Sequence, residues 1–410
     1  MTKLFKAALV IFTLALGNLK AQESINFKKT NYDEFIKEAK QIRKPVLIYF
    51  TGRGCALCAN MERQVFPKPE VYQLYNTSFI NIESYLDLRK ADPETLKLRR
   101  KYGIEAQPTF VFIDSTGAVI HKSGFQETDG FIKVGKQALG NDNYRGWLQQ
   151  FSEGKYDVET VQKFLEVETK PVVYAEVDYK CKAQEVLDAY FNSIPEGTYT
   201  TETNWRIIET YVANPYSKVF QYFLKNQHLF EQLYGIEAVN KKIYSVYDWA
   251  WAGNMGSSTY KNAEKMIKES EHPMAKLLIK FRQMGEEGYR IIKNQSDWKA
   301  FVAKYNTDIL NHNYIVNPNT VYEILDDLNS RSVKDVKSLT SVNKWMGAVL
   351  KIKDNEDVYY YSCYAKSFYL LGNKKAAINA QNKVIEIARS TNLDQSTIEE
   401  YRKVLAGYKK

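Results

Sequence analysis

Two cysteines three residues apart stand where an apolar run gives way to a helix-compatible segment. The run covers residues 46–50, and Cys55 and Cys58 follow it after a short turn. The first N–H groups of a helix have no partner within the helix, and the helix dipole adds partial positive charge at the same end. Both effects favour thiolate over thiol. We therefore expect Cys55 and Cys58 to form a reactive pair at a helix start.

A C-x-x-C dithiol forms a small-ring disulfide that opens and closes reversibly. In this interpretation Cys55 attacks, with a pKa lowered from about 8.5 by the helix start, and Cys58 resolves the mixed disulfide. Two alternatives stay open, a zinc half-site and a short structural disulfide. Zinc needs two more ligands, and Cys181 and Cys363 stand far from the pair and from each other in the sequence. The histidines are scattered as well: His121, His228, His272 and His312. We expect no metal.

Residues 22–142 alternate between helix-like and strand-like patterns. Strands are expected at residues 46–50, 79–85, 108–113 and 118–121, and helices at 31–42, from Cys55 onward, and at 70–76, 93–102 and 128–139. Such alternation predicts an α/β layer with helices on both faces of a central sheet.

Several motifs of this segment occur together in one known family. The strand at residues 46–50, the dithiol Cys55-Ala56-Leu57-Cys58, the later Gln107-Pro108-Thr109 and the turn at residues 114–117 resemble the thioredoxin family. Residues 44–52, together with Met61-Glu62, are similar to its exported members, which include bacterial periplasmic thiol reductase domains. The resemblance covers residues 24–142 and implies a thioredoxin-like fold there.

The resemblance also implies roles for residues beyond the dithiol. Pro108 is expected to be cis and to face the redox-active Cys55–Cys58 disulfide, with Gln107 and Thr109 beside it in substrate binding. A cis X–Pro bond turns the backbone so that residue 107 offers its N–H and C=O to an extended substrate. The alternative is an ordinary trans proline at the start of a strand. The implied partners are client proteins with disulfides and an electron donor, with no cofactor.

The chain departs from the family at positions that tune the dithiol. Gly54 stands where the family has an aromatic residue, and Tyr49 stands where it often has a buried acid. Glu62 follows Cys58 by four residues and is a candidate proton shuttle, with a solvated ion pair as the alternative. Arg53 is a candidate cation beside Cys55. The neutral pair Ala56-Leu57 leaves the direction of electron flow open.

Residues 143–410 lose the strand-like alternation and read as an all-α domain. Amphipathic helices are expected at residues 158–167, 182–193, 204–212, 218–234 and 295–305. Residues 341–390 resemble the tetratricopeptide repeat family, with helices at 358–371 and 374–388 around Gly372. Cys181 and Cys363 fall in expected helices, where buried free thiols or a disulfide between them are both open.

The N-terminus has the pattern of a cleavable secretory signal peptide at residues 1–21. Lys3 and Lys6 precede a ten-residue apolar run, and Ala21 ends the segment. An uncleaved anchor is the alternative, but anchors need about 20 apolar residues. Removing the segment lowers the formal charge from +9 by three, because it holds three lysines. A mildly basic chain without a concentrated basic run gives no reason to expect nucleic acid or stable membrane insertion.

These observations predict a thiol–disulfide oxidoreductase, periplasmic or otherwise exported, that reduces disulfides of client proteins. In this hypothesis the helical half, residues 143–410, selects the client, and the domain at residues 22–142 acts on it. The alternative is a protein-binding helical scaffold whose thioredoxin-like part has little activity. The sequence names no client, electron donor, helical-domain ligand or oligomeric state.

Overall fold

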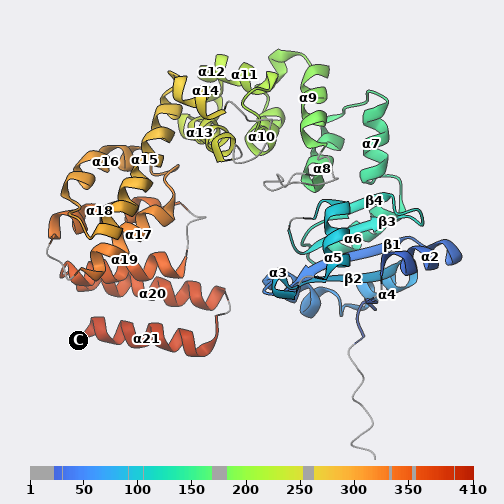
Figure 1. The fold of residues 1–410 in the computed structure, drawn as a ribbon, viewed down its shortest axis with the longest axis horizontal. Coiled ribbons are helices and arrows are strands. Elements are labelled where there is room, and N and C mark those ends of the chain that lie inside the picture. Colours follow the sequence, from blue (N-terminus) through green and yellow to red (C-terminus); the bar gives the residue numbers. More distant parts are fainter. Residues whose placement is uncertain are drawn as a thin grey trace, which may run out of the picture. The chain divides into compact units, whose positions relative to one another are not determined.

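A computed structural model gives the fold of the protein (Figure 1). It describes residues 23–29, 31–90, 92–104, 106–168, 182–252, 263–331, 335–352, 357–391 and 393–410. The predicted signal peptide and Cys181 therefore lie outside the described residues. The described chain forms two compact units, one of residues 23–212 with 217–219 and one of residues 213–216 with 220–410. The predicted domain boundary at residue 142 stays a prediction.

The first unit contains a four-stranded mixed sheet. Its strands are β1 (Val46–Gly52), β2 (Ile80–Leu86), β3 (Thr109–Ile113) and β4 (Val119–Ser123). They lie in the order β2-β1-β3-β4, with β1 parallel to β2 and the other pairs antiparallel. All seven residues of β1 are buried, as expected for a central strand covered on both faces.

Helices cover both faces of the sheet, as the sequence predicts. One face carries α2 (Tyr32–Ile42) and α5 (Pro93–Tyr102), whose apolar residues form one core with the strands. The other face carries α3 (Ala56–Asn60), the π-helical turn η1 (Met61–Val65), α4 (Pro69–Ser78) and α6 (Thr128–Leu139), which form the second core. A short 3-10 turn, η2 (Leu88–Lys90), follows β2.

Capping side chains explain where the helices of the first unit begin. The side chain of Asn31 accepts a hydrogen bond from the backbone N–H of Glu34, and Asp92 accepts one from Thr95. Each cap satisfies one backbone donor that the helix leaves unpaired. The helix that starts after Asp92 ends at Gly103, whose φ of 64° suits a residue without a side chain.

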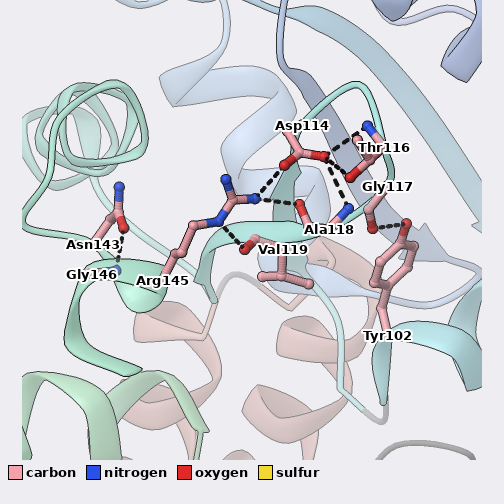
Figure 2. Close-up of polar contacts among 9 residues, drawn as sticks. All are labelled: Tyr102, Asp114, Thr116, Gly117, Ala118, Val119, Asn143, Arg145 and Gly146. Atoms are coloured by element: carbon pink, nitrogen blue, oxygen red, sulfur yellow. Dashed lines mark hydrogen bonds and ion pairs between the residues drawn. The ribbon is translucent and has the colours of Figure 1, made fainter. Parts of the chain in front are cut away.

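More helices follow the sheet within the first unit. They are α7 (Tyr144–Ser152), α8 (Val158–Glu168), α9 (Ala183–Ser193), the 3-10 turn η3 (Glu196–Thr198) and α10 (Glu202–Tyr211). Arg145 of α7 binds the turn between β3 and β4 through hydrogen bonds and an ion pair, as Figure 2 shows. Its guanidinium donates to Asp114 at 2.7 Å, to the carbonyl of Ala118 at 3.0 Å and to that of Val119 at 3.2 Å. The same Asp114 accepts from the backbone N–H groups of Thr116 and Ala118.

A buried ion pair connects the edge strand β4 with α8. Lys122 Nζ lies 3.1 Å from Glu168 Oε2, and both side chains are buried. The other carboxylate oxygen of Glu168 accepts a hydrogen bond from the backbone N–H of Lys182, just before α9. Strand β4 is therefore held to the helices that follow it by charge-assisted contacts.

The second unit is helical throughout its described residues. The helices are α11 (Lys218–Lys225, which begins in the first unit), α12 (Gln227–Tyr234), α13 (Ile236–Ala252), α14 (Ala263–Glu269), α15 (Pro273–Asn294), α16 (Lys299–Asn311), α17 (Pro318–Ser330), α18 (Val336–Val349), α19 (Val358–Leu370), α20 (Lys374–Ser390) and α21 (Gln395–Lys409). Helices α19 and α20 form the predicted helix pair around Gly372, whose φ is 77°. The tetratricopeptide-like character of this region stays a prediction.

Two helix predictions in this half were wrong. Residues 218–234 form two helices rather than one, with a break at Asn226, whose side chain donates to the carbonyl of Tyr222 at 2.9 Å. Asparagine competes in this way for the backbone groups of a helix. Residues 295–298 are not helical, because Gln295 is the left-handed cap of α15 and α16 begins at Lys299.

Candidate active site

Cys55 and Cys58 form a disulfide at the start of α3. The Sγ atom of Cys55 accepts a hydrogen bond from the backbone N–H of Cys58 at 3.1 Å, and Cys55 is the N-cap residue of the helix. The two cysteines differ in exposure, since Cys58 is 2% exposed whereas Cys55 is only partly buried. Cys55 is therefore the more accessible residue of the pair.

Two glycines shape the turn that leads from β1 to the dithiol. A side chain at Gly52 would lie 2.5 Å from the carbonyl oxygen of Leu86, so glycine allows β1 and β2 to stay close at their ends. Gly54 has a φ of 77°, the left-handed region that side chains disfavour. An aromatic side chain at position 54 would be strained in this conformation. The N–H of Arg53 donates to the Leu86 carbonyl at 2.9 Å and holds the turn against β2.

The Gln107–Pro108 peptide bond is cis and directly precedes β3. Thr109 pairs with Phe50 of β1, so this segment lies beside the strand that carries the dithiol turn. The side-chain amide of Gln107 lies against Gly52, where an added methyl group would be 2.6 Å from its oxygen. That buried oxygen has no hydrogen-bond partner among the described residues. The structure thus places the Gln107 side chain next to Gly52, which precedes Cys55 by three residues.

Tyr49 and Glu62 form a contact that the sequence analysis did not foresee. The hydroxyl of Tyr49 donates to Glu62 Oε1 at 3.0 Å, from a ring that is 1% exposed and stacks on Phe110 at 5.0 Å. Burial, followed by the nearby Glu62 carboxylate, raises the pKa of Tyr49, so the phenol keeps its proton at neutral pH. Tyr49 lies in the same apolar cluster as Cys58. Successive side chains of a strand point to opposite faces of the sheet, so Tyr49 shares this face with Leu47.

The Arg53 cation has an acidic partner. Its guanidinium lies 3.6 Å from Asp87 Oδ2, and Arg89 lies 3.3 Å from the same oxygen. The Arg53 side chain is about half exposed, so both the pair and any effect on Cys55 are weakened by solvent. A tuning role for Arg53 stays a prediction.

A model of the thioredoxin-like domain matches residues 32–139 of the chain. Residues 32–139 form a thioredoxin-like domain. The predicted fold class is thereby confirmed, a thioredoxin-like α/β fold followed by a largely helical region. A similar curated protein is the disulfide bond reductase DsbH of Chlamydia pneumoniae, 26% identical over 117 residues, which are 27% of this chain and 70% of DsbH.

Solved structures are also similar to the thioredoxin-like domain. A DsbH oxidoreductase is 24% identical with a TM-score of 0.26, covering 30% of this chain and 92% of its own. A putative disulphide-isomerase from Bacteroides thetaiotaomicron is 28% identical with a TM-score of 0.26, covering 28% and 94%. The C-terminal domain of Neisseria meningitidis DsbD in its oxidised form is 26% identical with a TM-score of 0.23, covering 26% and 90%.

The thioredoxin-like domain carries its cysteine pair in the C-x-x-C position that the family uses for chemistry. The domain match, the DsbH homologue and the Cys55–Cys58 pair support thiol–disulfide oxidoreductase activity. Among the residues that the structure describes, no helix is long and apolar enough to cross a membrane. Cys363 is a free, buried thiol, and burial raises its pKa to about 12, which makes it unreactive.

Proposed function

We propose that the protein is an exported thiol–disulfide oxidoreductase that reduces disulfides of client proteins. The observation that carries the proposal is the asymmetric exposure of the dithiol at the start of α3, with Cys55 accessible and Cys58 2% exposed. Thiol–disulfide exchange uses this asymmetry, because one sulfur forms the mixed disulfide with the client and the other then attacks the first.

Each reduction moves two electrons from the dithiol to the client. The Cys55 thiolate attacks one client sulfur, the client S–S bond breaks, and the departing thiolate takes up a proton. Cys58 then gives up its proton and attacks Cys55, so the mixed disulfide breaks and the second client thiol leaves. The protein is left with the Cys55–Cys58 disulfide. A donor protein with its own dithiol returns two electrons and two protons by the same exchange.

The segment 107–109 is proposed to hold the client backbone during the attack. Gln107 and Pro108 directly precede β3, which pairs with the strand that leads to Cys55. The N–H and C=O of residue 107 are suited to pair with an extended client strand, as a sheet edge does. The Thr109 hydroxyl donates to the carbonyl of Ala106 at 2.8 Å, and this hydrogen bond links the two ends of the segment around Gln107 and Pro108.

Glu62 is proposed to accept the proton that Cys58 must lose. It follows Cys58 by four residues, about one helical turn, and its carboxylate is held by the Tyr49 hydroxyl at 3.0 Å. A carboxylate fixed in this way is a suitable general base for a buried thiol. Tyr49 occupies the position of the usual buried acid, and with its raised pKa it donates a hydrogen bond instead of taking a proton.

The direction and the place of the reaction are also proposals. The C. pneumoniae relative is named a disulfide bond reductase, which favours reduction over isomerisation. The signal-like residues 1–21 support export to the periplasm. The redox potential of the Cys55/Cys58 couple tests the direction: a value near about −270 mV supports a reductase, and one near about −120 mV an oxidant.

The helical region from residue 143 onward is proposed to bind the client or another partner protein. Stacked helices leave extended surfaces for protein ligands. The competing proposal is that binding is the main function and the thioredoxin-like domain has little activity. Turnover of insulin disulfides tests both, with the Cys55→Ser variant as the control. Turnover lost in the variant supports the oxidoreductase, whereas equal turnover in the two proteins overturns it.

A further inference from the structure

Tyrosines are frequent in α19, and some of them stay in contact with solvent. Five of the 13 residues of this helix are tyrosines. Tyr359 is 64% exposed, and Tyr360 is only partly buried. Because tyrosine combines a large apolar ring with a polar hydroxyl, it is enriched at protein interfaces. The exposed rings at the start of α19 therefore indicate a contact surface.

Tyrosines of the neighbouring helices α17 and α21 lie beside those of α19. The ring of Tyr322 in α17 lies 5.7 Å from that of Tyr360, measured between the ring centroids. The Tyr360 hydroxyl donates to Asn319 Oδ1 at 2.9 Å, so the ring is held against α17. On α21, Tyr401 packs against the same apolar cluster as Tyr361 of α19. The rings are thus positioned before a partner binds, which lowers the entropy cost of association.

Two carboxylates lie at the same surface. Asp357 is the N-cap of α19 and accepts the backbone N–H of Tyr359 at 2.7 Å. Burial raises the pKa of Tyr322, and the carboxylates of Asp326 and Asp357 act in the same direction. Burial and the Asp357 carboxylate also raise the pKa of Tyr360. The negative charge of these carboxylates is therefore felt by rings of both α17 and α19.

Among the described residues, neither Asp326 nor Asp357 has a lysine or arginine at ion-pair distance. Lys366, the only cation within α19, lies seven residues beyond Tyr359, about two helical turns away. The chain as a whole carries a formal charge of +9, so the negative charge at this surface is local. Aromatic rings beside unpaired carboxylates suit ammonium and guanidinium groups, which they bind by cation–π contact and by charge.

We propose that a tyrosine–carboxylate surface on the second unit binds a lysine- or arginine-bearing segment of a partner protein. The surface consists of Tyr322, Tyr359, Tyr360, Asp326 and Asp357. This inference rests on the proposed partner-binding role of the helical region and states the charge of the partner. The rings supply apolar area and cation–π contacts, whereas the carboxylates attract the cation and repel an acidic segment.

Fluorescence anisotropy with the full chain and two labelled peptides tests this surface. The peptides have equal length, and one alternates lysine with serine while the other has glutamate in place of lysine. We expect the lysine peptide to bind about tenfold more tightly. The positive net charge of the protein would by itself favour the glutamate peptide, so a lysine preference requires a local acidic site. Added salt should weaken the preference.

Substitutions at the surface locate the binding site. Asp326→Asn together with Asp357→Asn removes both charges but keeps the helix cap, because asparagine caps as well as aspartate; the preference should fall below about threefold. Tyr359→Ala should weaken binding of the lysine peptide about threefold, and Tyr359→Phe should retain it, because the ring remains. The matched control is Glu185→Gln with Glu237→Gln, which removes two exposed carboxylates from α9 and α13 and should keep the full preference.

Three results overturn the inference: equal binding of the two peptides by the natural protein, a preference that survives the loss of both aspartates, and a preference lost equally in the control. Turnover of insulin disulfides by the same samples tests the proposed oxidoreductase separately. Turnover that depends on Cys55, without a lysine preference, keeps the oxidoreductase and removes the surface. A lysine preference without such turnover keeps the surface and removes the oxidoreductase.

Discussion

The stability of the thioredoxin-like domain should fall as the pH drops from 7 to 5, because of one buried histidine. His121 in β4 is 2% exposed, its ring lies edge-on to Trp147 at 5.5 Å, and its Nδ1 accepts the N–H of Tyr144 at 3.3 Å. Burial lowers the pKa of His121 from 6.5 to about 4, although the Asp142 carboxylate acts in the opposite direction.

The sign and size of the effect follow from linkage. Between pH 6.5 and 4 the unfolded chain binds a proton at His121 and the folded chain does not, so acid favours unfolding. The stabilisation is complete above pH 6.5 and is lost as the pH falls toward 4. Each unit of pKa difference corresponds to about 1.4 kcal/mol, which gives about 2 kcal/mol between pH 7 and pH 5.

Urea unfolding followed by tryptophan fluorescence measures this loss. His121→Gln lacks the titrating ring, so the difference in unfolding free energy between the natural protein and this variant isolates the histidine. The difference should change by about 2 kcal/mol from pH 7 to pH 5 in favour of the variant. A difference that stays constant over this range would refute the reasoning.

Further predictions concern the ion pair at β4, the dithiol turn and the proposed base. Lys122→Met removes the cation that lies 3.1 Å from the buried Glu168 carboxylate, and urea unfolding should show a loss of about 3 kcal/mol; a loss below about 1 kcal/mol would contradict a buried pair. Gly54→Ala forces a side chain into the left-handed region and should cost about 1 kcal/mol in the same assay, whereas Gly197→Ala, equally open but without positive φ, should cost less; equal losses would refute the backbone argument. Glu62→Gln should slow resolution of a Cys55 mixed disulfide roughly tenfold to a hundredfold at pH 7 in quenched-flow experiments, and an unchanged rate would exclude Glu62 as the base.

The fold of the thioredoxin-like domain could be predicted because its signals are local. Apolar runs that follow Pro45 and Pro108 mark β1 and β3, and the helices at residues 93–102 and 128–139 have the predicted bounds. The dithiol could also be predicted, because its cysteines are three residues apart and the helix that positions them starts between them. Gly117, at the end of the predicted turn at residues 114–117, has a φ of 86°, which a glycine adopts without strain.

Contacts between residues that are distant in the chain could not be predicted from the sequence. The pairing of Tyr49 with Glu62 depends on how η1 packs against β1, and no spacing rule gives that distance. The Lys122–Glu168 ion pair joins residues 46 positions apart. The break at Asn226 follows from a side chain that bonds its own helix, a choice that periodicity alone does not reveal.

The most direct test of the account is to trap the mixed disulfide on Cys55. A Cys58→Ser protein can attack a client but cannot resolve the product, so it should accumulate disulfide-linked adducts with exported proteins. Mass spectrometry should place every adduct on Cys55, and a protein with both Cys55→Ser and Cys58→Ser should form none. The absence of adducts, together with a Cys55 pKa near the free value of about 8.5, would contradict the central claim.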